Sequence, residues 1–130
     1  MRALTVWQPW AWAIVNGCKS IENRKWKPPH LGERIAIHAG LKVDEADAWD
    51  LIAEISGRRP PPPSEIDRGG IVGAATVVGL LTKSESPWFS GPYGWLLSIP
   101  RAVPLAPCRG ARKLWRVPDE IVRAVQESIR

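Results

Sequence analysis

The sequence lacks any apolar run long enough to cross a membrane. No stretch approaches the roughly 20 apolar residues that a membrane-spanning helix needs. The residues after Met1 contain no long apolar segment followed by a cleavage site of small residues, so no signal peptide is predicted. We therefore expect a cytoplasmic protein without a membrane partner.

Cysteine and histidine are too few and too scattered for a disulfide framework or a zinc site. The two cysteines, Cys18 and Cys108, do not form a CxxC pair. The two histidines, His30 and His38, are too far from the cysteines in the sequence to match the short ligand spacing of a zinc site. We expect two reduced thiols, no metal and no other cofactor. His38 follows an apolar run, so we expect it to be a hydrogen-bonded core residue.

The remaining composition is that of a globular protein whose charge is unevenly distributed. The 130 residues suffice for one domain, 1–130, and not for two. The net charge of +5 divides into +4 for residues 1–40, −3 for residues 41–68 and +4 for residues 69–130. Eight tryptophans exceed what a core of this size needs, and indole stacks well on nucleobases. Basic ends and surplus tryptophan favour a nucleic acid as partner.

Short segments separated by proline and glycine predict an α+β fold. Strands are expected at 4–7, 19–24, 34–39, 70–81, 93–99, 102–105 and 113–117. Helices are expected at 10–16, ended by Gly17; from Val43, ended by Gly57; and from Pro118, with Ile121, Val122, Val125 and Ile129 on one face. The proline-rich residues 58–64 predict an extended surface loop. We expect the strands to close into a small mixed β-barrel flanked by about three helices, the acidic second helix covering one side of the sheet.

One motif concentrates charged and aromatic residues. Residues 8–24 read QPWAWAIVNGCKSIENR, in which QPWA is followed by GxKxxExR. Further matching positions are Gly32, Ile35-x-Ile37-His38-Ala39, Gly70-x-Val72-Gly73, Trp95, Gly110 and Leu114-Trp115. In this order the motifs resemble those of the ASCH family, named for the activating signal cointegrator homology domain, over essentially the whole chain. The resemblance implies a PUA-like β-barrel and, by its cointegrator branch, a groove for RNA or DNA beside the motif.

The candidate binding residues lie in this motif and in a second basic cluster. Arg24 offers a planar fork for a phosphate or for a carboxylate such as Glu22, and Lys19 offers a compact charge. Trp10 and Trp26 flank these cations and suit unpaired bases, whereas Trp7, Trp12, Trp49 and Trp95 are expected in the core. The candidates for binding a single-stranded RNA or DNA are Trp10, Lys19, Ser20, Glu22, Arg24, Lys25, Trp26, Lys27, Arg109, Arg112 and Lys113. For Arg24, an ion pair that fixes the strand explains the residue equally well. For 109–113 a solvated face is the default.

Simple alternation along a strand at 19–24 separates Lys19 from Glu22, because neighbouring side chains point to opposite faces. The resemblance implies that both contribute to one groove. Either Lys19 lies in the turn after Gly17 or the strand is bulged, and the spacing does not decide between them.

The resemblance also implies a second class of function. Another branch of the ASCH family consists of amidohydrolases that deacetylate N4-acetylcytidine with a lysine, a nucleophilic threonine and a glutamate, and ribonuclease activity has been suggested for family members. Lys19 matches that lysine, but Glu22 fills the place of the threonine, and Ser20 stands two residues earlier. If the chain is a hydrolase, Lys19 and Glu22 are its catalytic candidates. The departure at position 22 favours binding, while RNA versus DNA and the oligomeric state stay open.

Overall fold

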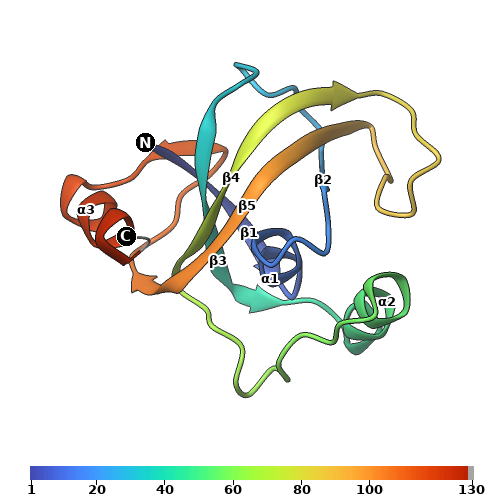
Figure 1. Cartoon of the computed structure of the whole chain (residues 1–130), viewed down its shortest axis with the longest axis horizontal. Coiled ribbons are helices and arrows are strands. Elements are labelled where there is room, and N and C mark those ends of the chain that lie inside the picture. Colours follow the sequence, from blue (N-terminus) through green and yellow to red (C-terminus); the bar gives the residue numbers. More distant parts are fainter. Residues whose placement is uncertain (129–130) are drawn as a thin grey trace.

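The computed structural model describes residues 1–128 and has the α+β composition that the sequence predicts. The strands are β1 (Arg2–Gln8), β2 (Ile21–Arg24), β3 (Arg34–Val43), β4 (Gly70–Leu81), β5 (Tyr93–Pro107) and β6 (Leu114–Arg116). The helices are α1 (Trp10–Val15), α2 (Ala46–Ser56) and α3 (Asp119–Ser128). Figure 1 shows α2 and α3 at opposite ends of the molecule with α1 between them. Ile129, expected on the apolar face of the last helix, lies outside the described residues.

The strands form one curved sheet that does not close into a barrel. Their order is β2-β5-β4-β3-β1-β6, so β2 and β6 are the edge strands. β1 runs parallel to β3, and the other neighbouring strands are antiparallel. The expected closure is wrong, because no backbone ladder within residues 1–128 joins β2 to β1 or to β6. The side chain of Arg24 on β2 instead bonds to the backbone of Thr5 on β1, and the candidate functional site lies at this gap.

Interruptions in the pairing of β4 with β5 allow one long strand where two short ones were expected. The register shifts between Ala74 and Thr76 and again between Ile71 and Gly73. Pro100 and Pro104 fall within the skipped positions of β5, where proline's missing N–H costs no ladder hydrogen bond. The predicted strands 93–99 and 102–105 are therefore one strand, bent rather than ended by its prolines.

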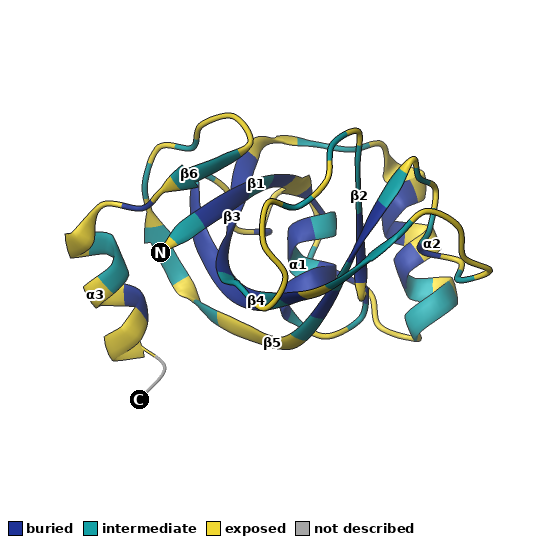
Figure 2. Cartoon of the chain, turned by 90° about the horizontal axis from the view of Figure 1, so that it is seen from above, coloured by how far each residue is buried: buried dark blue, intermediate teal, exposed yellow. Residues whose placement is uncertain are grey.

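Helix α1 occupies the concave side of the sheet (Figure 2). It packs against β1, β3, β4 and β5 and buries Ala11, Ala13, Ile14 and Val15. Gly17 takes a left-handed φ of 78° just after the helix, and Gly57 takes one of 75° after α2, so both predicted stops are confirmed. The expectation that α2 covers the sheet is wrong. It packs at one end of the molecule, where Ile52 belongs to the same buried hydrophobic cluster as Ala13 of α1 and Ile21 of β2.

The tryptophans divide between core and surface differently from the prediction. Trp49 and Trp95 are 3% and 0% exposed, which confirms their core positions, and Trp12 is half-buried. Trp7 is 48% exposed, so its predicted core position is wrong. Alternation along β1 explains the difference, because Val6 points into the core and its neighbour Trp7 points away.

His38 is a hydrogen-bonded core residue, as predicted. Its ring nitrogens lie 3.2 Å from Thr5 Oγ1 and 2.8 Å from the Cys108 carbonyl oxygen. Both cysteines are free, and burial raises the pKa of the Cys108 thiol. Among residues 1–128 there is no helix long and apolar enough to cross a membrane. The same residues contain no cluster of three or more side chains suited to a metal ion.

Candidate functional site

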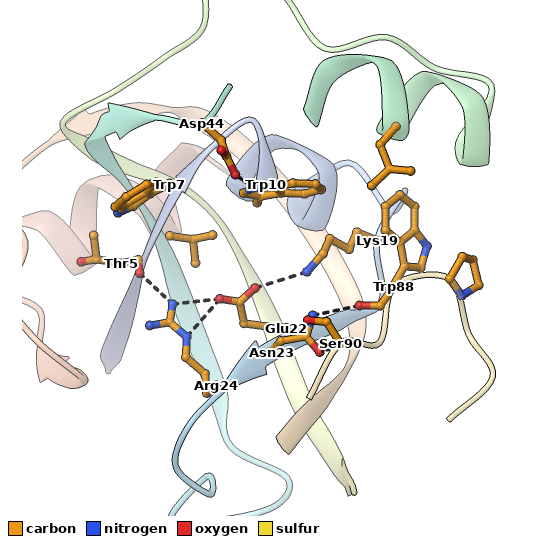
Figure 3. A pocket seen from close by; sticks show the side chains of 13 residues that line it. Thr5, Trp7, Trp10, Lys19, Glu22, Asn23, Arg24, Asp44, Trp88 and Ser90 are labelled. Atoms are coloured by element: carbon orange, nitrogen blue, oxygen red, sulfur yellow. Dashed lines mark hydrogen bonds and ion pairs between the residues drawn. The ribbon is translucent and has the colours of Figure 1, made fainter. Parts of the chain in front are cut away.

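An open cavity of about 480 Å³ lies where β2 approaches β1. This volume lies in the range of small-molecule binding pockets. The lining residues come from β1, α1 and the turn after it, β2, the segment between β3 and α2, α2 itself, and the loop between β4 and β5. They are Thr5, Val6, Trp7, Trp10, Lys19, Glu22, Asn23, Arg24, Asp44, Leu51, Pro87, Trp88 and Ser90. Figure 3 shows the charged side chains of the motif on one side of the cavity, with Trp7, Trp10 and Asp44 opposite.

Lys19 reaches the cavity from the turn after α1. Its backbone N–H donates to the Ala13 carbonyl oxygen at 3.0 Å, within the turn that Gly17 opens. Pairing with β5 begins one residue later, where the Ser20 carbonyl accepts from the Leu97 N–H at 2.8 Å. Lys19 thus precedes β2, so of the two explanations left open by the sequence, the turn is correct. Its side chain is buried and only 6% exposed.

Glu22 is the centre of an ion-pair triad with the buried Lys19 and the half-buried Arg24. Its Oε1 lies 3.3 Å from Lys19 Nζ, and its Oε2 lies 2.9 Å from Arg24 Nη2 and 3.0 Å from Arg24 Nε. Lys19 Nζ also donates to the Ile21 carbonyl oxygen, and Arg24 Nη2 donates to the Thr5 carbonyl oxygen at 2.8 Å. Both carboxylate oxygens are occupied, and the triad carries one net positive charge (Figure 3).

Trp7 and Trp10 form the wall opposite the charged side chains, and Trp88 lies at the end of the cavity beside Lys19 (Figure 3). Trp10 donates from Nε1 to Asp44 Oδ2 at 2.9 Å, which orients its ring, and Lys19 Nζ lies 5.7 Å from the ring centre. Trp88 is nearly buried, whereas Trp7 is half-exposed at the mouth. Flat aromatic surfaces therefore face a polar floor, an arrangement suited to a planar ligand with a polar edge.

Asn23 holds the loop that carries Trp88. Its Nδ2 donates to the Trp88 carbonyl oxygen at 2.9 Å. Its Oδ1 accepts from the backbone N–H groups of Ser90 at 2.9 Å and Gly91 at 3.1 Å. The Asn23 side chain thus supplies backbone hydrogen bonds that this irregular loop does not obtain from strand pairing. It thereby fixes the position of Trp88 in the cavity wall.

Of the residues predicted from the sequence, Trp10, Lys19, Glu22 and Arg24 line the cavity. The others lie outside it: Ser20, Lys25, Trp26, Lys27, Arg109, Arg112 and Lys113. Trp26 is half-buried and meets Trp95 edge-on, with ring centres 4.7 Å apart. Lys113 Nζ lies 5.9 Å from the Trp26 ring, so the second basic cluster comes near the first at this point.

Sequence reasoning missed the other lining residues, which are Thr5, Val6, Trp7, Asn23, Asp44, Leu51, Pro87, Trp88 and Ser90. Trp88 alone had a local signal, because a tryptophan in a loop of Ser, Pro and Gly often serves binding. In the sequence, Asp44 is explained by its place just before α2 alone, because an acidic residue is favourable at the positive start of a helix. Its bond to Trp10 depends on β3 ending beside α1, which no local pattern reveals.

Comparison with known proteins gives the family. A model of the ASCH domain matches residues 4–90. The chain belongs to the ASCH domain family. It is 24% identical over 138 aligned residues to human "Activating signal cointegrator 1", covering 97% of this chain and 24% of that protein. The mouse protein of the same name is 21% identical with the same coverage. The chain thus spans about a quarter of the length of these relatives.

Solved ASCH structures share the fold of this ASCH domain. The crystal structure of ASCH from Zymomonas mobilis superposes with a TM-score of 0.60 at 17% identity, covering 97% of this chain and 93% of that chain. Two mutant structures of the Zymomonas protein give TM-scores of 0.59. At this identity the likeness shows the α+β fold, and the chemistry of the cavity has to be argued from its own residues.

Proposed function

We propose that this ASCH domain binds single-stranded nucleic acid, RNA in the first instance, and that one unpaired base enters the cavity between β1 and β2. The observation that carries the proposal is a wall of tryptophans facing the Lys19–Glu22–Arg24 triad. Aromatic faces stack on any base, and a polar floor can hydrogen-bond to the edge of that base.

The donors of the triad suit the carbonyl oxygens and ring nitrogens of a base edge. Arg24 bonds to Glu22 and Thr5 through Nε and Nη2, and no protein group among residues 1–128 bonds to its Nη1. Lys19 contributes an ammonium that faces Trp10. Because Glu22 holds both cations in place, they are positioned before a ligand arrives.

The phosphates are proposed to lie outside the cavity, on the exposed cations. These are Lys25, Lys27, Arg109, Arg112 and Lys113. Lys27 Nζ lies 5.7 Å from the Tyr93 ring, and Lys113 Nζ lies over Trp26, so charge and aromatic surface also alternate here. Such a surface binds the backbone and bases of a flexible single-stranded nucleic acid without sequence specificity. A cytosolic location stays part of the proposal, since both cysteines are free thiols.

A hydrolase is the second candidate, and the Lys19–Glu22 contact of 3.3 Å favours it. A lysine and a carboxylate this close can exchange a proton with a substrate. For the amidohydrolase reaction the missing component is a nucleophile, because Ser20 is exposed and does not line the cavity. Thr5 also lines the cavity, but its hydroxyl is in contact with His38, Ala111 and Trp115. Binding is therefore the function that the geometry supports best.

Titration with short single-stranded RNA, followed by tryptophan fluorescence at several salt concentrations, tests the proposal. We expect the affinity to fall steeply with rising salt, because counterions are released from the RNA. Absent or salt-independent binding would contradict nucleic-acid binding. Incubation with RNA and with N4-acetylcytidine tests the alternative, and turnover that disappears in Lys19→Ala would support the hydrolase.

A further inference from the structure

We infer that Asp44 is a specificity-determining residue, whose carboxylate makes the cavity electrically neutral so that it accepts an uncharged ring and excludes an anion such as phosphate. The inference rests on the proposed function and adds to it what enters the cavity and which residue selects it. Asp44 belongs to none of the sequence motifs; it lies between the end of β3 and the start of α2.

The charges that line the cavity cancel. Lys19 and Arg24 share the single carboxylate of Glu22, which leaves one positive charge on the floor. Asp44 provides the opposite charge on the wall. Its oxygens accept from neutral donors, Trp10 Nε1 at 2.9 Å and the Glu45 backbone N–H at 2.7 Å. No ion pair to Asp44 is formed by the described residues 1–128.

An anion in this cavity meets attraction and repulsion together. The triad attracts it with one net charge, and Asp44 repels it with another. The three members of the triad already bond to one another, so a phosphate would also have to break Lys19 or Arg24 away from Glu22. A neutral ring breaks no ion pair and keeps the stacking surface of Trp10. Because Asp44 makes the cavity neutral, the cavity binds a base in preference to a phosphate.

Asp44→Asn removes the charge while its amide oxygen still accepts from the Trp10 indole. Asp44→Ser removes the same charge with a smaller side chain and repeats the test if the asparagine disturbs the loop. Asp47→Asn is the matched control, because Asp47 is an exposed acid in the first turn of α2 that does not line the cavity. It changes the total charge of the protein equally.

The probes are the four unmodified ribonucleosides and inorganic pyrophosphate, added to the full chain. Binding is followed through the NMR signal of the Trp10 indole N–H, which the Trp10→Phe variant assigns, so that only ligands in the cavity are scored. We expect wild type to bind a nucleoside in preference to pyrophosphate. In both Asp44 variants the ratio of pyrophosphate to nucleoside affinity should rise about tenfold. In Asp47→Asn it should change less than about twofold.

The inference is overturned if wild type binds pyrophosphate at Trp10 as tightly as it binds nucleosides, or if it binds no nucleoside there. An unchanged ratio in the Asp44 variants, or an equal rise in Asp47→Asn, also overturns it. RNA titration of the same samples separates the two failures. RNA binding with an unchanged ratio refutes only the role of Asp44, whereas absence of RNA binding refutes the proposed function.

Discussion

Arg24 on β2 donates a 2.8 Å hydrogen bond from Nη2 to the carbonyl oxygen of Thr5 on β1, across the gap where the sheet does not close. The same guanidinium binds Oε2 of Glu22 through Nη2 and Nε. One side chain thus joins two strands that lack a shared ladder and also forms the floor of the cavity. The structural and the ligand-facing roles that the sequence offered for Arg24 are compatible in this geometry.

Arg24→Lys should destabilise the protein although it keeps the charge. An ammonium lacks the planar fork that reaches Glu22 and Thr5 together, so at least one of these acceptors loses its partner. Because Arg24 is partly exposed, we expect a loss of about 1–3 kcal/mol in the free energy of unfolding. Urea denaturation measures it. Lys25→Gln, on an exposed neighbour, is the control, and an equal loss in both variants would refute the proposed link between β2 and β1.

Asn23→Ala should release the loop that carries Trp88. Three hydrogen bonds from the side chain are lost, and the amide hydrogens of Ser90 and Gly91 should exchange with solvent about tenfold faster or more. Asn23→Asp keeps the oxygen that both amides bind and should retain most of their protection. Hydrogen exchange followed by NMR gives the rates. Equal protection in wild type and Asn23→Ala would show that other contacts hold the loop.

Neutralising the exposed lysines should change the salt dependence of RNA binding. Each of Lys25→Gln, Lys27→Gln and Lys113→Gln should reduce the slope of log affinity against log salt by about 0.7 if that lysine contacts a phosphate. Lys83→Gln, in the loop between β4 and β5, is the control because Lys83 belongs to neither basic cluster. Slopes that stay at the wild-type value in all three variants would place the phosphates elsewhere.

The ion pair between Arg2 and Glu33 should make stability fall in acid. The hydrogen bond from Arg2 lowers the pKa of Glu33, so the pair stabilises the fold above the unfolded-state pKa of about 4.3. This contribution should disappear as the pH falls through the lowered folded-state pKa.

Glu33→Gln tests this ion pair. The variant should cost about 0.5 kcal/mol at pH 7 and nothing at pH 2, measured by urea denaturation, because the pair is partly exposed. Asp50→Asn breaks a more exposed pair with Arg59 and should have a smaller effect. A cost of Glu33→Gln that persists unchanged at pH 2 would mean that packing, and not charge, is responsible.

Local patterns predicted much of the secondary structure because the signals are local. Gly17 and Gly57 end their helices in the left-handed conformation that glycine tolerates, and the long apolar run at 70–81 is β4. The prediction of two short strands, one before and one after Pro100, was wrong because it depends on non-local pairing. Whether a proline ends a strand depends on the register of its neighbour, and β4 skips a position there.

The sequence by itself determined the family, the α+β class and four of the residues that line the cavity, Trp10, Lys19, Glu22 and Arg24, since spacing and residue type are enough for these. The tertiary structure decided the rest. It brought Asp44 to Trp10, placed Trp88 in the cavity wall through Asn23, turned Trp7 outward and left Trp26 outside the cavity. It also left the sheet open between β2 and β1, with Arg24 as the link to Thr5. These features depend on segments distant in the chain, whose approach is set by how α1 packs in the curved sheet.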